Sequence, residues 1–168
     1  MVPFAGWQMP LQYTKVKEEH LAVRQAAGLF DVSHMGLIGV TAASTETARL
    51  YLDRLVPQDI SKLYPGKAVY TQFLDENGGI LDDLIIYRLP EKTSNSDFEE
   101  FLVICNASNF DQNVQWMTEH IGAEEDVRLI HHSDTYGLLA LQGPVFKQVL
   151  AACGCPEEVI PKRFHVSD

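Results

Sequence analysis

Residues 77–89 read Asn77-Gly78-Gly79-Ile80-Leu81-Asp82-Asp83-Leu84-Ile85-Ile86-Tyr87-Arg88-Leu89. A glycine-containing turn followed by an apolar run is typical of a β-hairpin, whose first strand we place at residues 67–74. Alternate side chains of a strand share a face, so Asp82 and Asp83 point to opposite faces, each among apolar neighbours. We therefore predict a central strand over residues 80–89, with at least one of the two carboxylates partly removed from water.

The elements around this hairpin indicate the fold class. Ser44 begins a helical pattern that Pro57 ends, and Ser108 with Asp111 has the spacing of a capping box at the start of a second helix. Further strands are expected at residues 35–40, 101–105, 127–130 and 136–141. Hairpin connections dominate, so the predicted class is α+β, with mostly antiparallel sheets and flanking helices. Residues 44–133 have the element order of a ferredoxin-like unit.

The composition is that of an ordinary globular protein. Its 168 residues are 46% hydrophobic, and 13 basic against 23 acidic residues give a formal net charge of −10. This acidic balance argues against nucleic acid and an anionic membrane surface as partners, because both favour a basic face. We expect no membrane segment, since the chain has no apolar run of about 20 residues. We expect no secretory signal, since the N-terminus has neither a basic n-region nor a long apolar h-region. Three cysteines at irregular spacing favour a reducing compartment.

The Asp82-Asp83 pair is the strongest candidate for chemistry. A carboxylate removed from water must be paired, hydrogen-bonded or protonated, and such groups often move protons or stabilise cations. The alternative is that both carboxylates lie at the wet end of the strand and bond only to the hairpin turn.

Three other motifs carry weaker signals. Residues 31–34, Asp-Val-Ser-His, contain the residue types of a hydrolase triad, but neighbours on a short loop point in different directions. His131 and His132 face opposite sides of a strand, and Cys153 with Cys155 is a single pair. We therefore expect turn and packing roles for these residues, and no metal site.

Several stretches, taken in order, resemble one known family. They are Met1-Val2-Pro3-Phe4-Ala5-Gly6-Trp7 with Met9-Pro10, residues 20–24, residues 28–36, residues 78–87, Cys105-Asn106-Ala107 and Leu141-Gln142-Gly143-Pro144. Over its whole length the chain resembles the aminomethyltransferase (T-protein) family of the glycine cleavage system. The most specific motifs are DVSHMG at residues 31–36 and GGILDDLI at residues 78–85.

The resemblance implies a three-lobed fold around a central folate. Residues 44–133 would form a ferredoxin-like second lobe, inserted in a split first lobe. Residues 1–43 and 134–168 would be parts of that incomplete first lobe, and the third lobe would lie beyond Asp168. The chain is then expected to be a fragment that is inactive alone and leaves some apolar surface without its partner.

The resemblance also implies a reaction and its participants. Tetrahydrofolate, as co-substrate, accepts a methylene group from the aminomethyl-dihydrolipoyl arm of lipoylated H-protein, and ammonia is released. No metal takes part. The expected compartment is the cytoplasm of a bacterium, or the mitochondrial matrix if the source is eukaryotic.

Six residues match functional positions of the family. Asp83 matches the catalytic carboxylate, which would stabilise the iminium cation formed when the thiol leaves and help to position or deprotonate the attacking folate nitrogen. The positions that line the pterin and aminobenzoyl pocket are Met35, Tyr70, Tyr87, Ile104 and Asn106.

Two other functions remain open at this point. The same fold could serve as the folate-binding module of a sarcosine- or dimethylglycine-type dehydrogenase, or as a non-catalytic folate-binding relative. In a different class, the chain could be a protein-interaction domain whose Asp pair only closes a turn. A folate titration of the whole protein separates this last function from the others.

Overall fold

The computed structural model describes residues 1–90 and 100–167. The chain divides into two compact units, which are described separately. One unit combines Met1–His34 with Gly137–Ile160, and the other combines Met35–Tyr136 with Pro161–Asp168. Among the described residues, no helix is long and apolar enough to cross a membrane.

The second unit is built on an antiparallel sheet with the strand order β5-β6-β7-β4-β8. Its strands are β4 (Gly36–Thr41), β5 (Lys67–Leu74), β6 (Ile80–Arg88), β7 (Phe101–Cys105) and β8 (Arg128–His131). Its helices are α2 (Thr45–Leu55) and α3 (Phe110–Glu119), with short 3-10 turns η1 (Ile60–Lys62) and η2 (Ala107–Asn109). The predicted α+β class is confirmed, and β6 is central as predicted, since it lies between β5 and β7.

The boundaries of this unit differ from the expected range of 44–133. β4 begins at Gly36 and hydrogen-bonds to both β7 and β8, so it belongs to the sheet. The unit therefore has the order β-α-β-β-β-α-β, one strand more than a ferredoxin-like unit. The assignment of lobes of a larger protein remains a prediction.

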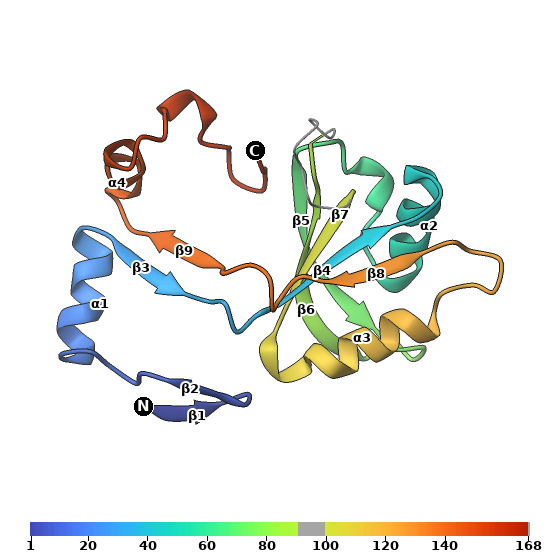
Figure 1. Ribbon diagram of the computed structural model, residues 1–168, viewed down its shortest axis with the longest axis horizontal. Coiled ribbons are helices and arrows are strands. Elements are labelled where there is room, and N and C mark those ends of the chain that lie inside the picture. The colour runs from blue at the N-terminus through green and yellow to red at the C-terminus, as the bar shows by residue number, and fades with distance from the viewer. Residues whose placement is uncertain (91–99, 168) are drawn as a thin grey trace. The chain divides into compact units, whose positions relative to one another are not determined.

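One face of this sheet is covered by α2 and α3 (Figure 1). The buried cluster joins apolar residues of the strands to those of both helices; it includes Ile38, Val40, Leu84, Ile86, Phe101 and Val103 from the sheet, and Leu52 and Met117 from the helices. The buried Tyr51 hydroxyl of α2 donates to the Met117 carbonyl of α3 at 2.6 Å, which ties the two helices together. Ser44 is the N-cap of α2, as predicted, and its side chain accepts from the Thr47 N–H.

The start of α3 differs from the prediction. The capping box of Ser108 and Asp111 is not formed, and the N-cap residue Asn109 makes no side-chain cap hydrogen bond. The η2 turn comes ahead of α3, and the Asn106 N–H that precedes it donates to Asp82 on β6 at 3.2 Å. A carboxylate from the sheet thus holds the segment that leads into α3.

The first unit consists of two small ladders and two helices. Its elements are β1 (Val2–Phe4), β2 (Trp7–Met9), α1 (Val16–Gln25), β3 (Gly28–Asp31), β9 (Leu139–Gln142), α4 (Phe146–Ala152) and the 3-10 turn η3 (Glu157–Val159). β1 pairs with β2, and β3 pairs with β9, both antiparallel. Gly143 has a φ of +120°, and a Cβ there would lie 2.4 Å from the Ala26 carbonyl oxygen, so the turn after β9 requires glycine.

The first unit leaves much apolar surface open. None of its described residues is buried, and large apolar side chains such as Leu11, Val16, Leu29 and Leu139 are at least 60% exposed. This agrees with the expected presence of unpartnered apolar surface.

The Arg54–Glu125 ion pair yields a test of the second unit. Both guanidinium arms of Arg54, on α2, donate to the Glu125 carboxylate, at 2.7 and 2.8 Å, and the Gly122 N–H adds a third bond. The Arg54 hydrogen bonds lower the pKa of Glu125 to about 2. A lowered pKa in the folded state stabilises the fold above the unfolded pKa near 4.5, and this contribution disappears as the pH falls towards 2.

We therefore expect Glu125→Gln to lower the free energy of unfolding at pH 7. Its difference from the wild type should shrink between pH 4.5 and pH 2, as urea denaturation across that range would measure. Glu124→Gln removes a neighbouring carboxylate and is the matched control. A deficit for Glu125→Gln that stays constant over this range would contradict the assignment.

Candidate functional site

The hairpin between β5 and β6 sets the direction of both aspartates. The Asp75 carboxylate accepts from the backbone N–H groups of Asn77 at 2.8 Å and Gly79 at 2.7 Å, which closes the turn. The register then shifts, because Phe73 pairs with Asp82 whereas Leu74 pairs with Ile80. The extra residue of this bulge directly precedes Asp82, and bulges are a common means of redirecting side chains near functional sites.

Asp83 points to the face of the sheet opposite α2 and α3 and is exposed. The Tyr70 hydroxyl of β5 donates to one of its carboxylate oxygens at 2.9 Å. The Asn106 side-chain amide donates to the other at 3.2 Å and to the Asp83 carbonyl at 3.1 Å. Three of the predicted site residues thus form one hydrogen-bonded group from three different segments.

The other predicted residues lie on or beside the same face. Tyr70, Ile85 and Ile104 are cross-strand neighbours in the register, so they form an apolar row beside Asp83. Tyr87 is half-buried two residues beyond Ile85, about 13 Å along the strand from Asp83. Met35 is half-buried and directly precedes β4, one residue before the Gly36–Cys105 pair. No hydrogen bond or ring contact described in the structure joins Tyr87 or Met35 to the Asp83 group.

Asp82 points the other way, beneath the start of α3, and is only 4% exposed. One carboxylate oxygen accepts from the Asn106 and Asn109 side-chain amides, both at 2.8 Å. The other accepts from the Asn113 amide at 2.6 Å and the Asn106 backbone N–H at 3.2 Å. The sequence predicted that one carboxylate would be partly removed from water, and it is Asp82 rather than the catalytic candidate Asp83.

Two of the asparagines around Asp82, Asn109 and Asn113, were not recognised in the sequence, whereas Asn106 was predicted as a site residue. Asn106, Asn109 and Asn113 are spaced i, i+3 and i+7, which places three amides on one side of a helical segment. Searching for polar residues at helical spacing, as is done for apolar ones, would have revealed them. Their acceptor, however, is distant in the sequence, so the pattern alone does not identify it.

The Asp83 group has a definite electrostatic character. The hydrogen bond to Asp83 raises the pKa of Tyr70, because ionising the phenol would place two negative charges side by side. Tyr70 therefore remains a donor at neutral pH. A carboxylate has about four acceptor positions, so Asp83 can still accept a proton or contact a cation after bonding to Tyr70 and Asn106.

The triad-like residues of the first unit have turn and packing contacts. The Asp31 carboxylate accepts from the Ser33 N–H at 3.0 Å, and the Ser33 hydroxyl accepts from the Leu138 N–H at 2.9 Å. The His34 ring packs edge-on against Phe4. These contacts are the turn and packing roles that the sequence indicated.

The described histidine and cysteine side chains do not form a cluster that could hold a metal ion. His132 is buried against Tyr136, whereas His131 is exposed and contacts Phe110. Over residues 1–90 and 100–167, no group of three His, Cys, Asp or Glu side chains is placed to hold a metal ion. Burial raises the pKa of Cys105 to about 11, so its thiol stays protonated at neutral pH.

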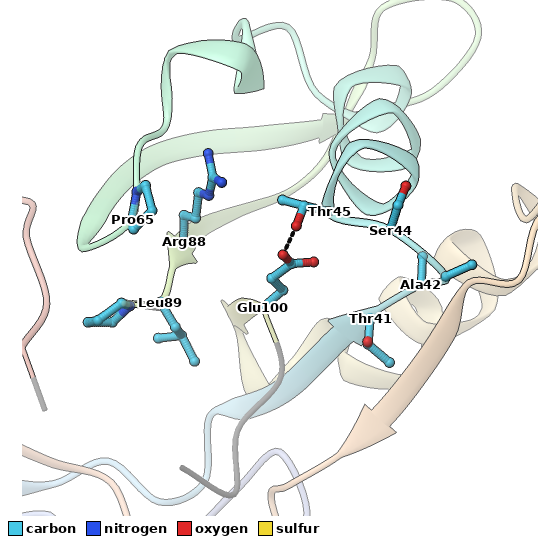
Figure 2. A pocket seen from close by; sticks show the side chains of 10 residues that line it. Thr41, Ala42, Ser44, Thr45, Pro65, Arg88, Leu89 and Glu100 are labelled. Atoms are coloured by element: carbon cyan, nitrogen blue, oxygen red, sulfur yellow. Dashed lines mark hydrogen bonds between the residues drawn. The ribbon is translucent and has the colours of Figure 1, made fainter. Parts of the chain in front are cut away.

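A hollow of about 400 Å³ lies elsewhere in the second unit, where β6 ends and α2 begins (Figure 2). Thr45 donates to Glu100 across it, and Arg88, which also lines it, donates to the Leu63 carbonyl at 2.8 Å. None of the residues that line it is a predicted site residue.

The fold and the site together define a class of protein, an antiparallel α+β chain that presents a hydrogen-bonded carboxylate on the open face of its larger sheet. The chain belongs to the family described as the GCVT N-terminal domain, whose sequence profile it matches over residues 1–165. The predicted resemblance is thus confirmed.

Individual relatives agree with this assignment. An aminomethyltransferase from Halalkalibacterium halodurans is 46% identical over 150 residues, which are 89% of this chain and 38% of the relative. Another from Chlorobium phaeobacteroides is 48% identical over 145 residues, 86% of this chain and 37% of the relative. The crystal structure of glycine cleavage system aminomethyltransferase T from Bartonella henselae matches with a TM-score of 0.83 and 36% identity, covering 98% of this chain and 42% of that one. The chain thus spans about two fifths of the length of these relatives.

The Tyr70–Asp83 bond can be tested by titration. In Asp83→Asn the carboxylate charge is lost, so we expect the pKa of Tyr70 to fall back towards the usual value near 10. NMR of ring-labelled tyrosine would follow it, with the Tyr70 signal assigned by its loss in Tyr70→Phe. Glu76→Gln removes an exposed carboxylate from the same hairpin and should leave Tyr70 unchanged. An unaltered Tyr70 titration in Asp83→Asn would show that the bond does not form.

Proposed function

We propose that this chain is part of a tetrahydrofolate-dependent aminomethyltransferase of the glycine cleavage system. The observation that supports it most directly is the exposed Asp83 carboxylate, held by Tyr70 and Asn106 on the open face of the sheet. The reaction that we propose is that of the aminomethyltransferases that the chain resembles. In it, lipoylated H-protein donates a methylene group, tetrahydrofolate accepts it and ammonia leaves.

The chemistry requires a negative group at two moments. Expulsion of the dihydrolipoyl thiolate from the aminomethyl arm forms a C=N bond and leaves an iminium cation, which a nearby carboxylate stabilises. A folate nitrogen then attacks that carbon and must lose its proton, and a second folate nitrogen takes the place of ammonia on the same carbon to close the methylene bridge. Asp83 suits both tasks, because its two donors hold it in one orientation while acceptor positions remain open.

The neighbouring residues suit a flat, partly apolar substrate. Tyr70 and Ile104 flank Ile85 in the register and offer an apolar surface beside Asp83. We propose that these residues, with Met35, Tyr87 and Asn106, contact the pterin and aminobenzoyl groups. The proposed reaction needs no metal, and the proposed compartment is the bacterial cytoplasm, since the relatives described above are bacterial.

Replacing the proposed catalytic carboxylate tests this function. Asp83→Asn in the whole protein should lower kcat at least about 100-fold, because the amide neither stabilises the cation nor accepts the proton. The assay follows formation of 5,10-methylenetetrahydrofolate and ammonia from aminomethylated H-protein. Asp83 is exposed, so the variant should unfold at nearly the temperature of the wild type.

The control for this test is Glu76→Gln, which removes an exposed carboxylate of the same hairpin and whose activity should match that of the wild type. Near-normal turnover by Asp83→Asn, together with a comparable loss of kcat in Asp82→Asn, would mean that the wrong carboxylate had been assigned. No binding of tetrahydrofolate by the wild-type whole protein would refute the function itself.

A further inference from the structure

We propose that Asp82 is a positioning residue that fixes the orientation of the Asn106 amide, so that Asn106 meets the substrate with its carbonyl oxygen. This inference rests on the proposed folate-dependent function and extends it to a particular contact. Asp82 itself is buried on the opposite face of β6 from Asp83 and acts only through Asn106.

The Asn106 amide bridges the two aspartates. Its nitrogen lies 2.8 Å from an Asp82 carboxylate oxygen, 3.2 Å from an Asp83 carboxylate oxygen and 3.1 Å from the Asp83 carbonyl oxygen. An amide nitrogen carries two hydrogens, so one is directed at Asp82 and the other is shared between the two Asp83 acceptors. Both donors of Asn106 are therefore committed to the two aspartates.

The opposite orientation of this amide is unfavourable. Turning it over would place its carbonyl oxygen against both carboxylates, and its two N–H groups would no longer face these acceptors. Asp82 cannot move aside to relieve this contact, because Asn109 and Asn113 hold its two oxygens from α3 and its N-cap. The backbone N–H of Asn106 also donates to Asp82, which restrains the residue at a second point.

The consequence concerns recognition. With its nitrogen committed, the Asn106 side chain offers its carbonyl oxygen, an acceptor, to a ligand. Asn106 should thus select a substrate edge that offers an N–H donor. A reduced pterin ring carries such N–H groups.

A double-mutant cycle distinguishes positioning from general structural support. In the whole protein, Asp82→Asn should raise KM for tetrahydrofolate at least about tenfold, which corresponds to the loss of about one hydrogen bond. The accompanying fold-decrease in kcat should be smaller than the fold-increase in KM. Asn106→Ala should have a similar effect on KM. In the Asn106→Ala background, Asp82→Asn should change KM by less than about twofold, because the residue through which it acts is gone.

The opposite results would overturn the inference. These are an unchanged KM in folded Asp82→Asn, or KM effects of the two substitutions that multiply in the double variant. Glu76→Gln is again the control for loss of a hairpin carboxylate and should leave KM unchanged.

A second measurement does not depend on the folding of Asp82→Asn. Nitrogen-15 NMR of the wild-type whole protein should show the Asn106 side-chain amide rigid before tetrahydrofolate is added. An amide group that reorients rapidly about the Cβ–Cγ bond of Asn106 would overturn the inference, whereas failure of the wild type to bind tetrahydrofolate would overturn the proposed function. The two failures are therefore distinguishable.

Discussion

The Asp82 carboxylate lies buried beneath the start of α3, where loss of water costs several kcal/mol unless donors replace it. The four donors that the structure describes are uncharged: three asparagine amides and one backbone N–H. They all come from the segment that follows β7, at the positive end of a helix. Satisfying this one group therefore ties β6 to the start of α3, and the exposed site is assembled on that connection.

Adjacent residues on the two faces of β6 have different roles. Because strand side chains alternate, Asp82 enters the core side and Asp83 the open side, and Asn106 reaches both. The same amide that helps to satisfy the buried charge also orients the exposed one. A rigid support of this kind suits a site that must hold a carboxylate in one orientation while a cation forms and a proton leaves.

Sequence reasoning was most successful where the signal is local. The Gly78-Gly79 turn, the apolar run of β6 and the Ser44 cap of α2 were all predicted, because each depends on a few neighbouring residues. It was less successful where distant segments meet. The second unit begins with β4 rather than with the helix that follows it, and the predicted capping box of α3 does not form. Contacts between distant segments, such as the pairing of β4 with β8, are not visible within a short window.

The sequence by itself determined the antiparallel α+β class, the family and the two carboxylates as the centre of interest, since periodicity, turn residues and motif order are written along the chain. Only the tertiary structure decided which carboxylate is buried, since that depends on which face of β6 the helices cover. It also decided that Tyr70 and Asn106 bond to Asp83 and that Asn109 and Asn113 bond to Asp82. Those contacts arise from strand register and helix placement, which no single segment encodes.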